Sequence, residues 1–206
     1  MIRVHRIPFS TNVERVALAA GIKGIDVEWV DHDPADRSVI AELSGQELVP
    51  VAEIEDDVVS DSMRIVERLE RLRPEPRLYP EHPASLAVAG IFIDWFNEVW
   101  KGPPNAIDDE RSRPAPDEAR IERLLSRARG WRPRFEGMLA AHPFLMSSEV
   151  GVADVCAFPF LKYAVVETPA DDVEPFHRIL EECLKPADDY PLLREWVARV
   201  DALPRA

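Results

Sequence analysis

The sequence predicts two domains, a mixed α/β domain followed by an all-helical domain. Up to about residue 73, short apolar strands alternate with amphipathic helices. Four prolines then fall between residues 74 and 83, which is typical of a stiff, extended linker. Beyond them the apolar residues recur with helical spacing. We therefore place the domains at residues 1–76 and 84–206, with a linker at 77–83.

The first domain opens with a βαβ unit. Residues 2–7 form an apolar strand, and residues 27–30 alternate as a second strand. Between them lies one helix, which we expect to end at Gly24. Because only a helix separates the two strands, we expect them to be parallel. The helix has one apolar face, formed by Val13, Val16, Ala17 and Ala20.

The rest of this domain is predicted as helix, strand, strand and helix. Asp33 followed by Pro34 indicates the start of the first of these helices, because Asp caps a helix and Pro fits its first position. Residues 48–54 and a strand starting at Val58 are separated by a short acidic turn, which predicts an antiparallel hairpin. A further helix opens at residues 60–62.

The second domain is predicted to be helical throughout. The first helix has a wide apolar surface between residues 86 and 100, and a proline-rich acidic loop is expected at 102–116. The pattern at 121–139 indicates a long helix that is kinked or divided near Gly130 and Pro133. Gly151 is the expected cap of another helix, and Asp154 would accept a bond from the backbone of that cap. The last helix starts near residue 190.

Composition narrows the classes of function. The net charge of −13 provides no basic stripe and argues against a nucleic-acid partner. The two cysteines, Cys156 and Cys183, have no metal-ligand spacing, which predicts a reducing compartment and no metal site. No apolar run approaches the roughly 20 residues that span a membrane, and the first residues do not resemble a signal peptide. We therefore expect a cytoplasmic protein that does not bind membranes.

The turn between the first strand and the first helix is the candidate site. Ser10, Thr11 and Asn12 place small polar side chains beside the unpaired N–H groups of a helix start. Those groups carry partial positive charge and favour an anion. Residues 11–14 match a capping box, which would leave Ser10 free for another role. The alternative is that Ser10 simply caps the helix.

Five short motifs together resemble the cytosolic glutathione transferases. They are Ser10, Val49-Pro50, Asp61-Ser62, the GVAD run at 151–154 and the YPLLREW run at 190–196. This resemblance implies a thioredoxin-like N-terminal domain joined to an all-α C-terminal domain. Because no Cys stands at the Ser10 position and no Tyr stands early in the first strand, the chain is most similar to the serine-type classes and their bacterial relatives. Asp61 departs from the commoner Glu or Gln, and Gly151 from the commoner Ser or Thr.

The resemblance also implies roles for individual residues. Ser10 would donate a hydrogen bond to the glutathione sulfur, with Thr11 and Asn12 as reserve donors. Lowering a thiol pKa from about 8.5 by two units requires about 2.7 kcal/mol, close to what one hydrogen bond and a helix start supply. Further residues would hold the peptide. A cis Val49-Pro50 bond would face the cysteinyl part, Asp61 and Ser62 the γ-glutamyl end, and His32, Arg37 or Gln46 the glycyl carboxylate.

A second, apolar substrate would lie against the first helix of the C-terminal domain. The suggested wall residues are Phe9, Trp95, Phe96, Val99, Trp100 and Tyr163, although aromatic stripes at helical spacing more often belong to a core. Asp154 is interpreted as a cap rather than a catalytic acid, and Cys156 as a core residue. Arg15, Arg64 and Arg68 are either solvated or contribute positive charge to the site.

The sequence thus predicts a homodimeric transferase that conjugates glutathione to small apolar electrophiles. Glutathione would be a co-substrate, with no other cofactor and no metal. Three alternatives stay open. The first is a glutathione-dependent isomerase or lyase, and the second is a non-catalytic carrier with the same fold. The third is a transferase that uses another low-molecular-weight thiol.

Overall fold

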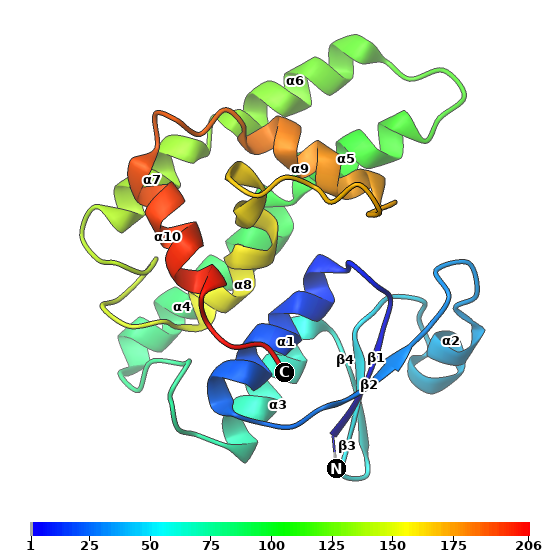
Figure 1. Cartoon of the computed structure of the whole chain (residues 1–206), viewed down its shortest axis with the longest axis vertical. Helices are drawn as coiled ribbons and strands as arrows, with labels where there is room; N and C mark the ends of the chain where they lie inside the picture. The colour runs from blue at the N-terminus through cyan, green and yellow to red at the C-terminus, as the bar shows by residue number, and fades with distance from the viewer. Residues whose placement is uncertain (1) are drawn as a thin grey trace. The chain divides into compact units, whose positions relative to one another are not determined.

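The structure is a computed structural model that describes residues 2–206. The chain divides into two compact units. The first runs to Leu78 and also includes Ala202–Ala206, and the second is Tyr79–Asp201 (Figure 1). The final five residues therefore group with the N-terminal unit, whereas the sequence analysis had placed them in the helical domain. Among the described residues, no helix is long and apolar enough to cross a membrane.

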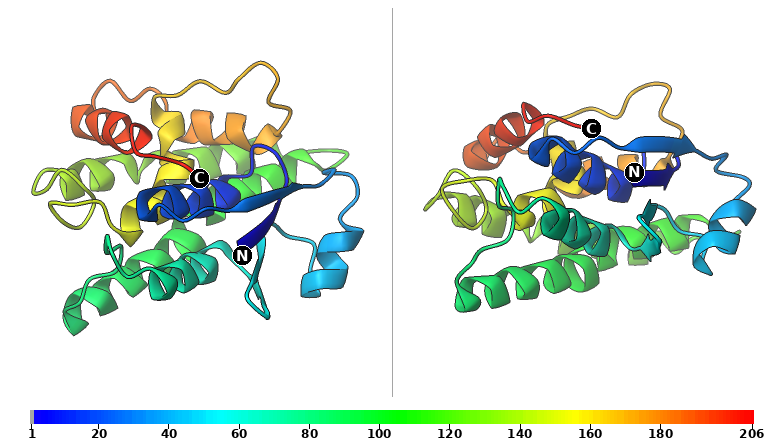
Figure 2. Two further views of the ribbon diagram at one scale, coloured as in Figure 1. Left: turned by 60° about the horizontal axis from the view of Figure 1, so that its bottom comes forward. Right: turned by 90° about the horizontal axis from the view of Figure 1, so that it is seen from below.

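The first unit is a four-stranded mixed sheet with three helices. The strands are β1 (Ile2–Arg6), β2 (Glu28–Asp31), β3 (Val51–Ile54) and β4 (Asp57–Ser60), in the order β2-β1-β3-β4. β1 pairs in parallel with β2, while β3 is antiparallel to both β1 and β4. The helices are α1 (Thr11–Lys23), α2 (Ser38–Ser44) and α3 (Ser62–Leu72). α1 and α3 lie on one side of the sheet and α2 on the other (Figures 1 and 2).

Most of these elements match the prediction. α1 ends at Gly24, which adopts a left-handed conformation with φ of 60° as a terminal glycine does. α2 was predicted to start at Asp33 and instead starts at Ser38. The prediction was wrong because the Asp33 side chain accepts a bond from the backbone of Ala35 and forms a local turn. Asp36 then accepts two bonds from Ser38, one from its backbone and one from its hydroxyl.

The second unit consists of helices. α4 (Pro83–Trp95) continues into a π-helix, η1 (Phe96–Trp100). α5 (Gly102–Arg111), α6 (Glu118–Arg129), α7 (Arg132–Leu139) and α8 (Val152–Leu161) follow. A 3₁₀ turn, η2 (Lys162–Ala164), precedes α9 (Pro175–Leu184) and α10 (Pro191–Asp201). The predicted division of the 121–139 helix is present as the break between α6 and α7.

In this unit one prediction was wrong and one helix was missed. The loop expected at 102–116 is mostly helix, because Pro103 and Pro104 occupy the first turn of α5, where a missing backbone N–H costs nothing. α9 was not predicted at all; it buries Ile179, Leu180 and Leu184. The core of the unit is an aromatic cluster in which Trp100 stacks on Phe96 at 4.6 Å between ring centroids.

The last residues of the chain pack on α1 and β2 within the first unit. The Ala206 N–H donates to the Ala17 carbonyl at 3.0 Å, and the Trp29 indole donates to the Ala206 carbonyl at 3.2 Å. The close approach requires a glycine, because a Cβ atom on Gly21 would lie 2.3 Å from the Pro204 carbonyl oxygen.

Candidate functional site

The register of the sheet brings the predicted site segments to one edge. His5 near the end of β1 pairs with Val51 at the start of β3, and Val51 pairs with Ser60 at the end of β4. His5 also pairs with Val30 near the end of β2. The segments that follow β1, β2 and β4, and the segment that precedes β3, therefore all leave the sheet at the same edge.

Ser10 is the N-cap of α1. Its Oγ accepts a long hydrogen bond of 3.4 Å from the backbone N–H of Val13. The predicted capping box with Thr11 as cap is wrong, since Thr11 is already the first helical residue and is buried. The cap bond uses a lone pair of the hydroxyl oxygen, and no acceptor among residues 2–206 takes the hydroxyl proton. Ser10 therefore caps the helix and still has a hydrogen to donate.

Phe9, directly before Ser10, has an unusual backbone conformation. Its φ is 65°, in the left-handed region that bulky residues avoid, and its side chain is 45% exposed. Such a conformation costs of order 1–3 kcal/mol and persists only where the surroundings fix it. The strain therefore falls at the residue that sets the direction of Ser10.

The segment before β3 contains the predicted cis bond. The Val49-Pro50 peptide is cis, Pro50 is buried and Val49 is half-buried. The strand begins one residue later, at Val51. These two residues thus lie at the sheet edge where β1 ends.

Asp61 and Ser62 form the start of α3. The Asp61 carboxylate accepts bonds from the backbone N–H groups of Met63 at 2.9 Å and Arg64 at 3.0 Å, so it is the N-cap. Asp61 is exposed and has a φ of 78°, again in the left-handed region. Ser62 is only 3% exposed. Asp61 therefore caps α3, and its role in ligand binding stays a prediction.

Arg15 connects the starts of the two helices. Arg15 is 1% exposed, and one of its guanidinium nitrogens donates to Asn12 Oδ1 and to Ser62 Oγ, each at 3.2 Å. The sequence predicts for Arg15 only a solvated position or a contribution of positive charge to the site. No sequence pattern marks it as buried; the structure shows that residues 11, 15, 19 and 23 lie at four-residue spacing and that all four are buried.

The three candidates for a glycyl carboxylate differ in how they are engaged. His32 Nε2 lies 2.8 Å from His5 Nδ1. Both ends of the Gln46 amide are used locally, with Nε2 donating to Ser44 and Leu48 and Oε1 accepting from Leu48. Arg37 uses Nε and one terminal nitrogen for backbone carbonyls. Its other terminal nitrogen makes no hydrogen bond or ion pair with residues 2–206, so Arg37 keeps a charged donor for a ligand.

A polar network lies on the sheet near this edge. His5 is buried and its Nε2 lies 3.0 Å from Glu53, while its Nδ1 contacts His32. The hydrogen bond with His5 holds the pKa of the Glu53 carboxyl below its usual value, with a smaller contribution from the charge of Arg3. The network links β2, β1 and β3 at the point where the site segments diverge.

The residues suggested for a second-substrate wall belong to different units. Phe9 lies in the first unit, and the remaining residues lie in the helical one. Trp95 and Val99 are half-buried, whereas Phe96 and Trp100 belong to the buried aromatic cluster. Tyr163 is buried and stacks on His177 at 4.8 Å. Their role in substrate binding stays a prediction.

Asp154 has the structural role that the sequence predicted. Its carboxylate accepts bonds from the backbones of Gly151 and Leu145, both at 2.9 Å, and from the indole of Trp196 at 2.7 Å. Burial raises the pKa of this carboxyl, against the opposing effect of these donors. Asp154 therefore fixes the start of α8 from inside the core of the helical unit.

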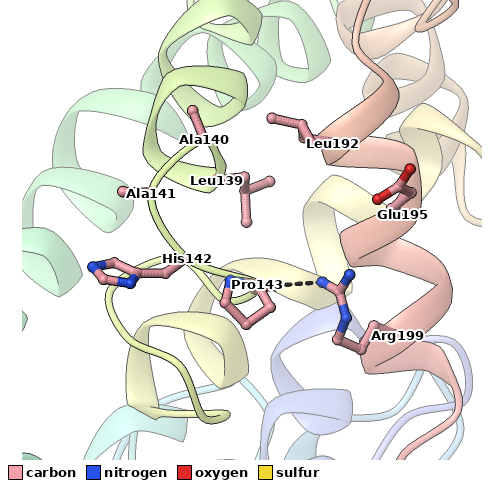
Figure 3. A pocket seen from close by; sticks show the side chains of 8 residues that line it. All are labelled: Leu139, Ala140, Ala141, His142, Pro143, Leu192, Glu195 and Arg199. Carbon is pink, nitrogen blue, oxygen red and sulfur yellow. Dashed lines mark hydrogen bonds between the residues drawn. The ribbon is translucent and has the colours of Figure 1, made fainter.

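The helical unit also has a cavity of about 280 Å³ between the end of α7 and α10 (Figure 3). Arg199 donates to the Pro143 carbonyl at its margin, and His142 points away from the space. The cavity is lined by Leu139, Ala140, Ala141, His142, Pro143, Leu192, Glu195 and Arg199. None of the predicted site residues lines it.

Comparisons with known proteins identify the family. The model of the glutathione S-transferase N-terminal domain matches residues 4–77, and that of the C-terminal domain matches residues 118–199. Maleylacetoacetate isomerase from Rattus norvegicus is 26% identical over 182 residues, which cover 80% of this chain and 78% of the relative. Glutathione transferase omega-1 from Caenorhabditis elegans is 25% identical over 201 residues, covering 96% of this chain and 76% of the relative.

Solved structures agree with this assignment of the fold. A glutathione S-transferase from Methylobacillus flagellatus, solved with glutathione bound, has a TM-score of 0.80 and 22% identity; the match covers 97% of this chain and 94% of that one. The two domain models fall on the two units of the structure, and the mixed sheet and helical unit are those that the resemblance implied. The chain belongs to the glutathione transferase family.

Proposed function

We propose that this protein binds glutathione at the start of α1 and uses the thiolate to attack small apolar electrophiles. The observation that carries this proposal is the hydrogen bonding of the Ser10 hydroxyl. Its oxygen is held by the helix through Val13, and its proton is available at the positive end of a 13-residue helix. Stabilising a thiolate requires a donor of this kind at this place.

The energy required is within reach of the site. A shift of two pKa units in a thiol corresponds to about 2.7 kcal/mol. A hydrogen bond to a charged group contributes about 1.5–3 kcal/mol, and a helix terminus adds about 0.3–1 kcal/mol. Ser10 thus acts as a donor to sulfur. No His or Lys within the turn is placed to remove its proton, so it is not proposed as a nucleophile.

A titration of bound glutathione tests the proposal. The ultraviolet absorbance of the thiolate, followed against pH, is expected to show a lowered thiol pKa in the wild type and a pKa nearer 8.5 in Ser10→Ala. Ser10→Thr keeps the hydroxyl and should keep most of the shift. Ser112→Ala removes an exposed hydroxyl from the other unit and serves as control. An unchanged thiol pKa in Ser10→Ala contradicts the role of Ser10.

A second candidate function is glutathione-dependent isomerisation of a small unsaturated acid. It is favoured by the rat relative, which is named maleylacetoacetate isomerase. In such a reaction the thiolate adds to a double bond and leaves again after rotation, so glutathione is recovered. Thiol counting separates the two activities. Conjugation consumes one glutathione for each product molecule, whereas isomerisation proceeds with glutathione far below the substrate concentration.

The remaining parts of the ligand are assigned by chemistry. We propose that Asp61 and the start of α3 receive the γ-glutamyl end, that the Val49 backbone pairs with the cysteinyl part, and that Arg37 holds the glycyl carboxylate. Arg37→Met should weaken binding of glutathione but not of γ-glutamylcysteine, which lacks the glycine. Tight binding of glutathione without a thiolate signal would instead favour a carrier, and no binding would favour another thiol.

We further propose a cytoplasmic homodimer. Neither Cys156 nor Cys183 is in a disulfide, and both are buried, which suits a reducing compartment. Leu86, Val88 and Ile91 on α4 are 44%, 52% and 67% exposed, and exposed apolar side chains of this kind suit a protein partner. Sedimentation equilibrium tests the dimer, and Ile91→Asp should shift the mass toward the monomer. A monomeric wild type at micromolar concentration would contradict this proposal.

A further inference from the structure

We propose that Arg15 is a positioning residue of the glutathione site. By donating to Asn12 Oδ1 and Ser62 Oγ, it orients both side chains so that the Asn12 amide N–H groups and the Ser62 hydroxyl proton can donate to an anionic group of the ligand. The inference rests on the proposed function and deepens it. It assigns the recognition of the α-carboxylate at the γ-glutamyl end of the peptide to donors that Arg15 orients.

The three side chains differ in their hydrogen-bonding capacity. A guanidinium group only donates, whereas a serine hydroxyl and an asparagine amide both donate and accept. Placed alone at a helix start, Ser62 and Asn12 could present either an oxygen or a proton to a ligand. An obligate donor at 3.2 Å from both oxygens takes one lone pair of each and turns the protons of both side chains away from Arg15.

Two proton-bearing atoms are then left over. The Asn12 amide nitrogen and the Ser62 hydroxyl proton must point away from Arg15, and no acceptor among residues 2–206 receives either of them. They lie at the starts of α1 and α3, where the backbone N–H groups also favour an anion. Both starts are at the sheet edge that collects the site segments.

Burial makes the arrangement rigid. Arg15 is 1% exposed and Ser62 is 3% exposed, so water does not compete freely for these bonds, and hydrogen bonds strengthen in such surroundings. The two partners come from different helices, 3 and 47 residues away in sequence from Arg15. One guanidinium nitrogen therefore fixes the spacing between the donors of α1 and α3.

Calorimetric titration with two peptides measures how strongly the site prefers a ligand that carries the α-carboxylate. One is glutathione, and the other is 4-aminobutyryl-Cys-Gly, which lacks only the α-carboxylate of the γ-glutamyl residue. Loss of a charge-assisted hydrogen bond weakens binding by about tenfold or more. The wild type should prefer glutathione by at least about tenfold, and Arg15→Met should reduce that preference to about threefold or less. Arg15→Lys, which still only donates, should retain most of it.

The design separates positioning from a general structural role. A loosened fold would weaken both peptides equally, whereas the inference requires the ratio of their affinities to change. Ser62→Ala should reduce the ratio as well, and adding Arg15→Met to it should change the ratio less than Arg15→Met does alone, because only Asn12 is then left for Arg15 to orient. Arg71→Met removes an arginine from α3, the helix that begins at Ser62; the Arg71 side chain is 66% exposed and pairs with Glu67. This control should leave the ratio unchanged.

The outcomes are distinguishable. If the wild type does not bind glutathione, the proposed function fails and this inference fails with it. If the wild type binds and discriminates but Arg15→Met discriminates equally well, only the inference is overturned. Should Arg15→Met not fold, Arg15→Gln replaces it. Its amide can also accept a proton from Ser62, so the ratio should fall at least about threefold, and an unchanged ratio overturns the inference.

Discussion

Replacement of Asp154 should produce a large and graded loss of stability. The carboxylate is 1% exposed and satisfies three donors, two on Oδ1 from Leu145 and Trp196 and one on Oδ2 from Gly151. Asp154→Ala removes every one of these acceptors. Each buried donor left without a partner costs about 1–3 kcal/mol. Allowing for some relaxation, we expect a loss of about 4–6 kcal/mol in the free energy of unfolding.

Asp154→Asn should cost less, for a geometric reason. The amide oxygen can replace Oδ1 and keep the bonds from Leu145 and Trp196, but the amide nitrogen then faces the Gly151 N–H. One bond is lost, and two donors oppose each other. We expect a loss of about 1–3 kcal/mol. Urea unfolding followed by circular dichroism measures both values, and Asp154→Ala within about 1 kcal/mol of the wild type would refute the reasoning.

The same carboxyl should leave a signature in the pH dependence of stability. Burial raises the pKa of Asp154 in the folded state above its value in the unfolded chain. The folded state therefore binds a proton more tightly, and this contribution is full below the unfolded pKa of about 3.9 and is lost as pH rises through the folded pKa. The stability of the wild type relative to Asp154→Asn should fall with rising pH in that window. A difference that grows with pH would mean that the three donors outweigh burial.

Three further experiments have defined outcomes, two with substituted proteins and one with the wild type. Lys23→Met should cost about 3–5 kcal/mol in urea unfolding, because it breaks a buried pair with Glu70 at 2.5 Å; a cost below 1 kcal/mol would contradict this. Cys183 should resist a thiol reagent in the native protein at pH 8 and react after unfolding, because burial raises its pKa to about 12; fast native labelling would be inconsistent with that burial. Gly21→Ala should displace the segment around Pro204 and increase amide hydrogen exchange at the end of the chain, while an unchanged exchange pattern would argue against the close packing.

The parts of the fold that sequence predicted well depend on local chemistry. The Gly24 terminus, the β3–β4 hairpin and the bond from Asp154 to the Gly151 cap each involve residues within a few positions of one another. Such patterns are visible in sequence because neighbouring residues supply both partners. The cis Val49-Pro50 bond was accessible for another reason, since the family resemblance pointed to it.

The parts that sequence missed depend on distant partners or on exact position. Arg15 and Lys23 are charged and so suggest a solvated face, yet their acceptors on Ser62 and Arg73 lie 47 and 50 residues away. α5 was missed because proline was taken as a helix breaker. At the first turn of a helix the same residue is favourable, and sequence alone does not fix where that turn begins.

The packing of Ala202–Ala206 on α1 joins two segments that are synthesised at different times. The N-terminal unit leaves the ribosome first, but the segment that covers Gly21 and accepts the bond from Trp29 is among the last residues of the printed sequence to emerge. Until then, this side of α1 is exposed to solvent. The helix that Ser10 caps therefore gains these contacts only after the helical unit has been synthesised.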